Sequence, residues 1–215
     1  YAMKYTMEIL KIQLELDGIK KANLKVIKPN VKISFGKNSI FPLRVTHSIP
    51  DATLYVLNTN SGSIVYTGDF IFDPTMTASF SCDIGKLAYI GKQNVLCLMT
   101  ESMYAANQGF TSPKHRVAGF IRNVLHDNEN RIIMSVLPAH IYRIQEIFNE
   151  VSKTNRKIVI MGKLLQDIIN MSLEGKYLTI NHNKIGDLSN LNDKGVIVLV
   201  SDLKEKPYTN LERIL

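Results

Sequence analysis

The stretch from Ile40 to Phe70, IFPLRVTHSIPDATLYVLNTNSGSIVYTGDF, decides the fold of this chain. Its apolar residues predict three short strands, and the turn-forming residues at 58–62 separate the second strand from the third. The strands are predicted at 41–45, 53–57 and 64–67. His47 follows the first strand and Asp69 follows the third. We expect these two side chains to converge at one edge of a sheet, because loops held on a rigid scaffold are where chemistry is usually found.

Composition sets the class of protein. The chain has 215 residues, of which 45% are hydrophobic and 21% charged, so it can bury a real core in one large or two modest domains. No apolar run reaches the ~18 residues that a membrane span needs. The first residues carry Lys4 and Glu8 and lack a small-residue cleavage site, which argues against a signal peptide. Cys82 and Cys97 lack CxxC spacing and are interpreted as reduced thiols, which indicates a cytoplasmic protein.

The balance of charge is basic. The formal net charge is +7, and such a surface favours polyanions, nucleic acid above all. The segment from Lys20 to Ser34 alternates lysines with apolar residues, which predicts a half-exposed strand pair turning at Pro29 and Asn30. A solvated sheet face is the simpler explanation of these lysines. The functional explanation is that they line a path for RNA.

The second half of the chain alternates strands with helices. Strands are predicted at 95–99, 132–136, 158–161 and 196–200, and helices at 112–125, 139–152 and 164–173. The strand at 95–99 is expected to be buried because all its residues are apolar. The alternation predicts a mostly parallel sheet with helices on both faces, as in a small Rossmann-like α/β domain. No GxGxxG follows the first of these strands, so a dinucleotide site is not favoured.

The motifs THSIPDA and YTGDFIFDPT, with His47 and Asp69 22 residues apart, resemble the ribonuclease J family of metallo-β-lactamase enzymes with a β-CASP insert. GKQNVLCLMTESMYAANQGFT, RIIMSVLPAHIYRIQ, RKIVIMGKLL and KPYTNLERI resemble successive β-CASP segments. The resemblance implies an α/β fold: part of a metallo-β-lactamase αββα sheet over 1–88, then an incomplete β-CASP domain over 89–215. Because the chain opens on Tyr1 and leads at once into a helix, we expect it to be a piece of a longer protein.

The resemblance also implies a metal site. His47 would bind one metal and Asp69 would bridge two, the metals being two zinc ions, with manganese or magnesium as alternatives. Asp69 and Glu101 are the implied catalytic residues; Glu101 stands where the family more usually has Asp, and an ordinary exposed glutamate explains it equally well. The family's HxHxDH motif is absent, since none of the five histidines forms an HxH pair. We therefore expect the chain to bind metal weakly or not at all on its own, because zinc sites typically use at least three protein ligands.

Other family positions are altered. In the second β-CASP motif, His140 stands where the family has Asn and Tyr142 where it has His, while Arg143 is retained. The resemblance implies that these three residues contact RNA or phosphate, and a helix-surface arginine is the alternative explanation of Arg143. A neutral phenol cannot replace an imidazole near pH 7. A glycine-rich loop has become Asp202–Pro207, without glycine. These changes leave a second possibility, that the chain comes from a catalytically inactive relative of the family.

Three functions follow. The first is part of a metal-dependent RNA-cleaving hydrolase of the ribonuclease J type, a 5′-exonuclease or endonuclease that binds RNA and assembles with a like subunit as a homo- or hetero-oligomer, without a membrane. The chain alone is expected to be inactive. The second is an inactive subunit of the same fold with a structural or RNA-binding role. The third is an unrelated α/β hydrolase or a β-lactam-cleaving enzyme, and the β-CASP-like segments argue against it.

Overall fold

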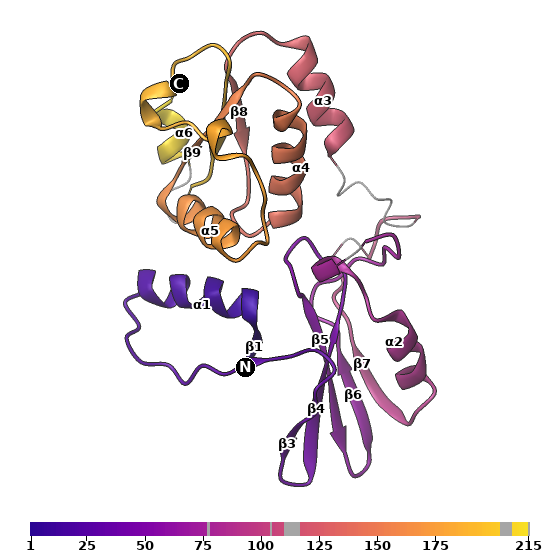
Figure 1. Cartoon of the computed structure of the whole chain (residues 1–215). Coiled ribbons are helices and arrows are strands. Elements are labelled where there is room, and N and C mark those ends of the chain that lie inside the picture. The colour runs from indigo at the N-terminus through magenta and orange to yellow at the C-terminus, as the bar shows by residue number, and fades with distance from the viewer. Residues whose placement is uncertain (77, 104, 110–116, 203–207, 215) are drawn as a thin grey trace. The chain divides into compact units, whose positions relative to one another are not determined.

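The computed structural model describes residues 1–76, 78–103, 105–109, 117–202 and 208–214 (Figure 1). The chain forms two compact units, Tyr1–Pro113 and Lys114–Leu215. The boundary that the resemblance places near residue 88 separates family domains and stays a prediction. Within the described residues, no helix combines the length and the apolar character that crossing a membrane requires.

The first unit is built on a five-stranded sheet. Its elements are β1 (Ala2–Met3), α1 (Lys4–Leu16), β2 (Val26–Ile27), β3 (Ile33–Phe35), β4 (Asn38–Arg44), β5 (Thr53–Thr59), β6 (Gly62–Tyr66), the 3₁₀ turn η1 (Ala78–Phe80), α2 (Ile84–Gly91) and β7 (Val95–Met99). The strand order is β3-β4-β5-β6-β7. The pairs from β3 to β6 are antiparallel, and β7 runs parallel to β6. The chain therefore crosses over through α2 before β7 is added at the edge.

One face of this sheet forms the core of the first unit. Alternate residues of the strands point to this face and are buried, as the period of two in a strand requires. The buried residues are Leu43, Val45, Leu54, Val56 and Val65, and Ile90 of α2 packs on them. The apolar pattern of the stretch from Ile40 to Phe70 therefore positions the strand ends, because a shift of one residue would expose this whole set.

The turn into β6 depends on Gly62. Its φ of 142° is one that side chains rarely adopt, and a Cβ there would lie 2.7 Å from Leu96 Cγ and 2.8 Å from the Asn94 carbonyl oxygen. Asn94 Nδ2 donates to the Ser61 carbonyl at 3.0 Å, and Ser63 N–H donates to the Asn94 carbonyl at 2.9 Å. Close backbone approach at Gly62 thus fixes where β7 joins β6.

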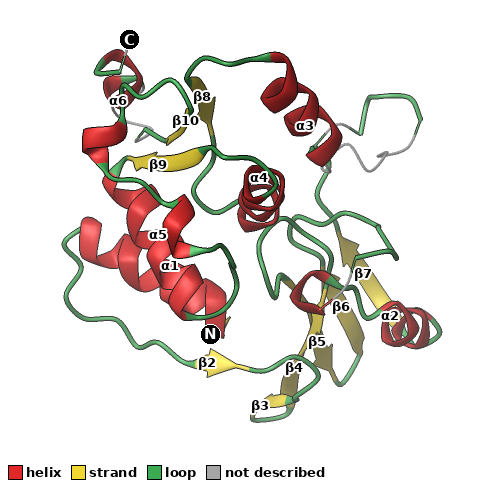
Figure 2. Cartoon of the chain, turned by 45° about the horizontal axis from the view of Figure 1, so that its top comes forward, coloured by secondary structure: helices red, strands yellow, loops and turns green. Residues whose placement is uncertain are grey.

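The second unit is a three-stranded parallel sheet with helices (Figure 2). Its elements are α3 (Ala118–Asp127), β8 (Ile132–Ser135), α4 (Ile141–Ser152), β9 (Lys157–Met161), α5 (Lys163–Glu174), the 3₁₀ turns η2 (His182–Lys184) and η3 (Leu188–Asn190), β10 (Val196–Val200) and α6 (Thr209–Glu212). The order β8-β10-β9 places the last strand in the middle. All five residues of β10 are buried, which confirms the expectation of an α/β layer covered on both faces.

A buried carboxylate ties two helices of the second unit together. Glu150 of α4 is 4% exposed, and it accepts two hydrogen bonds of 3.0 Å from the Arg122 guanidinium of α3. Lys153 Nζ donates to the same carboxylate at 2.7 Å. These hydrogen bonds lower the pKa of Glu150 to about 2 against the cost of burial. The helices are therefore held in place by charge as well as by apolar packing.

Several expectations about local structure are wrong. The strand at 95–99 was expected to be buried, but Leu96, Leu98 and Met99 are each more than half exposed because β7 is the edge of the sheet. The lysine-rich segment turns at Pro29 and Asn30 as expected, yet its strands do not pair with each other. Instead β2 pairs with β1, and β3 pairs with β4.

The helix expected at 112–125 is also shifted. It begins at Ala118, after Val117, and runs to Asp127. Residues 112–116, where the helix was expected to begin, lie outside the described residues, as do residues 203–207 of the altered loop. Both cysteines are free thiols.

Candidate active-site edge of the first sheet

Three predicted site residues follow three strands that end at the same edge of the first sheet. β4 and β6 run in the same direction because each is antiparallel to β5, and β7 is parallel to β6. His47 follows β4, Asp69 follows β6 and Glu101 follows β7. We call these three residues, at the carboxyl ends of their strands, the site edge. The strand directions therefore bring His47 and Asp69 to the same end of the sheet, as expected.

Backbone hydrogen bonds hold the strand exits side by side. Ile71 N–H donates to the Thr46 carbonyl at 2.7 Å, forming an isolated antiparallel bridge. Thr67 N–H donates to the Met99 carbonyl at 3.0 Å. The first bond places the residue before His47 beside the chain that leaves Asp69. The second ties the end of β6 to the end of β7, two residues before Glu101.

The electrostatics of His47 agree with this arrangement. Burial of the half-exposed imidazole lowers the pKa of His47, while the nearby carboxylates of Asp69 and Glu101 act to raise it. Both carboxylates therefore lie close enough to act on the ring, although both side chains are exposed to solvent. The lowered pKa favours the neutral imidazole at neutral pH, which is the form that binds a metal.

An ion pair closes the loop that carries His47. Arg44 Nε donates to Asp51 Oδ1 at 3.0 Å, joining the end of β4 to the residue that precedes β5 by two positions. Asp51 has a positive φ of 55°, and its N–H donates to the Ser79 carbonyl at 2.7 Å. Thr53 Oγ1 donates to the Asp51 carbonyl at 2.8 Å. The ion pair thus fixes both ends of the loop, and the hydrogen bond to Ser79 ties it to η1.

The residue before His47 is fully buried. Thr46 is 0% exposed, and its hydroxyl has no hydrogen-bond partner among the described residues. Its backbone amide donates to the Cys82 sulfur, which opposes the effect of burial in raising the pKa of that thiol. A buried hydroxyl without a partner typically costs about 1–3 kcal/mol. The buried hydroxyl next to His47 is therefore expected to lower the stability of the fold.

The donor set at the site edge is one imidazole and two carboxylates. Such nitrogen and oxygen donors suit zinc and manganese. However, no group of three or more His, Cys, Asp or Glu side chains among the described residues is arranged to hold a metal ion. That His47 and Asp69 belong to a larger set of metal ligands stays a prediction. Glu101 Oε2 accepts from the Met103 amide at 2.7 Å, so its carboxylate is also engaged in its own turn.

The remaining predicted residues belong to the second unit. His140 precedes α4, and its N–H donates to the Leu137 carbonyl at 3.0 Å. Tyr142 is half-buried in the first turn of the helix, and Arg143 is exposed. Their proposed roles with RNA or phosphate stay predictions.

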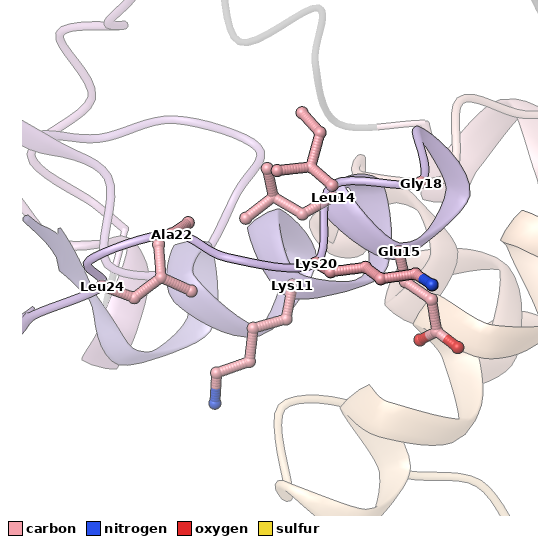
Figure 3. Close-up of a pocket in the computed structure, with 8 residues that line it drawn as sticks. Lys11, Leu14, Glu15, Gly18, Lys20, Ala22 and Leu24 are labelled. Carbon is pink, nitrogen blue, oxygen red and sulfur yellow. The ribbon is translucent and has the colours of Figure 1, made fainter.

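A hollow elsewhere in the first unit has different chemistry. It measures about 360 Å³ and lies between α1 and the segment that follows it (Figure 3). Leu14, Ala22 and Leu24 supply apolar lining, and Figure 3 shows Lys11 and Lys20 extending in different directions. Its polar groups do not converge on one point, so the site edge is the better candidate for chemistry.

Comparison with known proteins places these observations in a family. A model of the family "Ribonuclease J, beta-CASP domain" matches residues 129–215. Ribonuclease J2 of Bacillus subtilis is 31% identical over 218 residues, covering 100% of this chain and 39% of that protein. Ribonuclease J of Thermus thermophilus is 30% identical over 219 residues, covering 100% of this chain and 38% of that protein.

Residues 129–215 thus match the β-CASP domain of ribonuclease J, and the whole chain is similar to part of ribonuclease J proteins.

The chain spans about two fifths of the length of the curated relatives it matches, 39% of the Bacillus protein. A crystal structure of a protein of unknown function from Enterococcus faecalis V583 shares its fold, with a TM-score of 0.69 and 17% identity over 95% of this chain and 53% of the other.

Sequence reasoning missed three residues that support the loop beside the site edge: Arg44, Thr46 and Asp51. Two of them carried a signal. Arg44 and Asp51 have opposite charges, stand at the two ends of the His47 loop, and are the first charged residues on either side of His47. The burial of the Thr46 hydroxyl left no trace in the sequence, because Thr is common both in strands and at their ends.

Proposed function

We propose that this chain is part of a metal-dependent hydrolase that cleaves RNA, acting as a 5′-exonuclease or endonuclease in RNA processing and decay. The observation that carries the proposal is the convergence of His47, Asp69 and Glu101 at one sheet edge, in a chain that aligns with ribonuclease J proteins over its whole length. The names of those relatives describe ribonucleases, and this chain retains their order of segments.

Each residue of the site edge has a distinct role in this proposal. The His47 imidazole, held neutral by partial burial, offers a nitrogen donor to a metal. Asp69 is exposed after β6 and would offer carboxylate oxygens to the metals. Glu101 would add negative charge beside them and accept a proton. When bound, two zinc ions, or manganese or magnesium, would supply Lewis-acid stabilisation of the phosphodiester oxygens and an activated water.

The partners of the proposed enzyme follow from the same assignment. RNA is the substrate, and a second ribonuclease J-type subunit is the proposed protein partner. The net charge of +7 supports a polyanionic substrate, because it raises the local concentration of RNA near the surface. A cytoplasmic location suits both RNA decay and the free thiols of Cys82 and Cys97.

The test measures cleavage of 5′-monophosphorylated RNA by the protein that contains this chain, with Zn²⁺ or Mn²⁺ added. His47→Ala and Asp69→Asn should each reduce cleavage by at least a hundredfold, since each removes a ligand to the reacting centre. The matched control is His126→Ala, because His126 is a highly exposed histidine of the second unit. Cleavage that survives His47→Ala would refute the proposed site.

The alternative from the sequence is an inactive subunit that binds RNA or a partner. The comparisons do not favour it over the hydrolase. It predicts a different result in the same experiment: no cleavage above background by the unmodified protein with either metal, with RNA binding intact in the His47→Ala variant.

A further inference from the structure

The first unit contains a long stretch of chain without acidic residues. No Asp or Glu occurs from Gly18 to Pro50. This stretch carries six lysines and one arginine, and the lysines are Lys20, Lys21, Lys25, Lys28, Lys32 and Lys37. A chain whose total net charge is +7 therefore concentrates much of its positive charge in one part of one unit.

These six lysines are not used to hold the fold together through ion pairs. All six are exposed, and none forms an ion pair with a carboxylate in the part of the chain that the structure describes. Other lysines do form such pairs: Lys11 with Glu8 at 2.9 Å, Lys153 with Glu150 at 2.7 Å and Lys163 with Asp167 at 2.6 Å. Their charge is thus available to a ligand.

Two exposed aromatic rings stand among the lysines. Tyr1 is 53% exposed and Phe35 is 43% exposed, and their ring centroids lie 5.6 Å apart in an edge-to-face arrangement. Lys25 Nζ lies 5.4 Å from the centroid of the Tyr1 ring and donates to its hydroxyl at 3.3 Å. Rings fixed against each other lose little freedom when they bind a flat ligand.

We propose that single-stranded RNA binds at these six lysines together with Tyr1 and Phe35, which we call the lysine–aromatic surface. The proposal rests on the proposed function only in taking RNA as the polyanion. Lysines pair with phosphates of any sequence, and exposed rings stack on bases. Stacking selects unpaired bases, because the bases of a duplex already stack on one another.

The position of this surface defines its role relative to the site edge. Phe35 pairs with Asn38 at the start of β4, whereas the exit to His47 lies beyond Arg44 at the other end of that strand. Seven strand residues span roughly 20 Å. The lysine–aromatic surface thus holds RNA away from the reacting centre and acts through binding.

The first measurement is RNA affinity of this chain as a function of salt, by fluorescence anisotropy with a single-stranded 12-mer. Lys25→Gln/Lys28→Gln/Lys32→Gln should reduce the slope of log affinity against log salt by about 2, because each phosphate contact on a single strand contributes about 0.7. The control is Lys86→Gln/Lys92→Gln/Lys194→Gln, which removes the same charge from exposed lysines elsewhere. Equal losses in both triple variants would show that net charge alone binds RNA.

The second measurement tests how much the Phe35 ring contributes to RNA binding. Phe35→Leu keeps an apolar side chain and should weaken binding of the single strand about fivefold or more, with the salt slope unchanged. Binding of a 12-base-pair duplex should not change. Equal effects on single strand and duplex would overturn the stacking role. Tighter binding to phosphatidylserine vesicles than to RNA would assign the surface to membranes instead.

These outcomes are separable from those of the proposed function. His47→Ala should leave RNA binding by this chain intact, since His47 lies outside the surface. RNA binding that depends on Lys25, Lys28, Lys32 and Phe35 without cleavage by the containing protein would refute the hydrolase and keep the surface. Cleavage by that protein, with unchanged RNA affinity in both the triple lysine variant and Phe35→Leu, would refute the surface and keep the hydrolase.

Discussion

Arg44 Nε and Asp51 Oδ1 lie 3.0 Å apart and join the two ends of the loop that carries His47. The Asp51 side chain is 12% exposed and that of Arg44 is 33% exposed, so the pair is partly shielded from water. It therefore sets the geometry of the site edge more firmly than a pair on the open surface, which typically contributes less than about 1 kcal/mol. The site edge depends on this pair as well as on the sheet.

Breaking this pair should loosen the loop. We expect Asp51→Asn to lower the free energy of unfolding by about 1–2 kcal/mol, because the Arg44 charge loses its partner. Urea unfolding followed by circular dichroism measures the loss. The double variant Arg44→Met/Asp51→Asn completes a double-mutant cycle, and a coupling energy indistinguishable from zero would contradict a stabilising pair.

The Thr46 hydroxyl should be dispensable for stability. Because it is buried without a partner among the described residues, Thr46→Val should leave stability unchanged or raise it by about 1 kcal/mol. Thr59→Val is the matched comparison, since Thr59 Oγ1 donates to the Gly62 carbonyl at 2.7 Å and its loss should destabilise. A marked fall in melting temperature for Thr46→Val would reveal a partner for this hydroxyl.

The titration of His47 should reflect burial and its acidic neighbours. Its pKa is lowered from 6.5, so the stability it contributes is present above pH ~6.5 and is lost as pH falls toward the folded pKa. Asp69→Asn should lower the pKa of His47 further, because it removes a carboxylate that raises it. Proton-detected NMR titration of the imidazole measures both values. An unchanged pKa of His47 in Asp69→Asn would show that the two side chains lie apart.

The carboxylate of Glu150 should stabilise the second unit in a pH-dependent way. Its pKa of about 2 lies below the ordinary 4.5, so its contribution is present above pH ~4.5 and is lost as pH falls toward 2. We expect Glu150→Gln to cost about 1–3 kcal/mol at pH 7, reduced because Arg122 and Lys153 are largely exposed. Glu174→Gln, at an exposed position of α5, is the control, and equal melting temperatures for the two variants would refute the prediction.

A methyl group at Gly62 should disturb the junction of β6 and β7. Gly62→Ala would place a Cβ 2.7 Å from Leu96 Cγ at a φ of 142°, so we expect a loss of about 1–3 kcal/mol. Gly85→Ala in α2 meets no atom within 4 Å and should stabilise by up to about 1 kcal/mol. Urea unfolding of the two variants should move in opposite directions, and a neutral Gly62→Ala would show that the loop relaxes freely.

The parts of the fold that the sequence predicted are those set by local pattern. The alternation in β5 and the helical spacing in α4 are visible in a few neighbouring residues, and so are the strand exits before His47 and Asp69. The directions of β4 and β6 then follow from short connections to β5, which is why the site edge could be foreseen.

The parts that could not be predicted depend on distant neighbours. The apolar residues of β7 predicted a buried strand, but burial of its side chains depends on whether other elements cover the faces of the sheet at that strand. The segment from Lys20 to Ser34 has the pattern of a hairpin, yet its two strands pair with β1 and β4, which lie outside that segment of the sequence. Neither the exposure of β7 nor the pairing of this segment can be predicted from a few neighbouring residues.

The central place of β10 has a consequence for synthesis of the protein. Among the described strands, β8 and β9 pair with β10 and not with each other, so the three-stranded sheet cannot form until residues 196–200 have been made. At about 5–20 residues per second, the ribosome needs about 2–8 s to pass from residue 161 to residue 200. The second unit therefore completes its sheet late in synthesis, after both outer strands have been made.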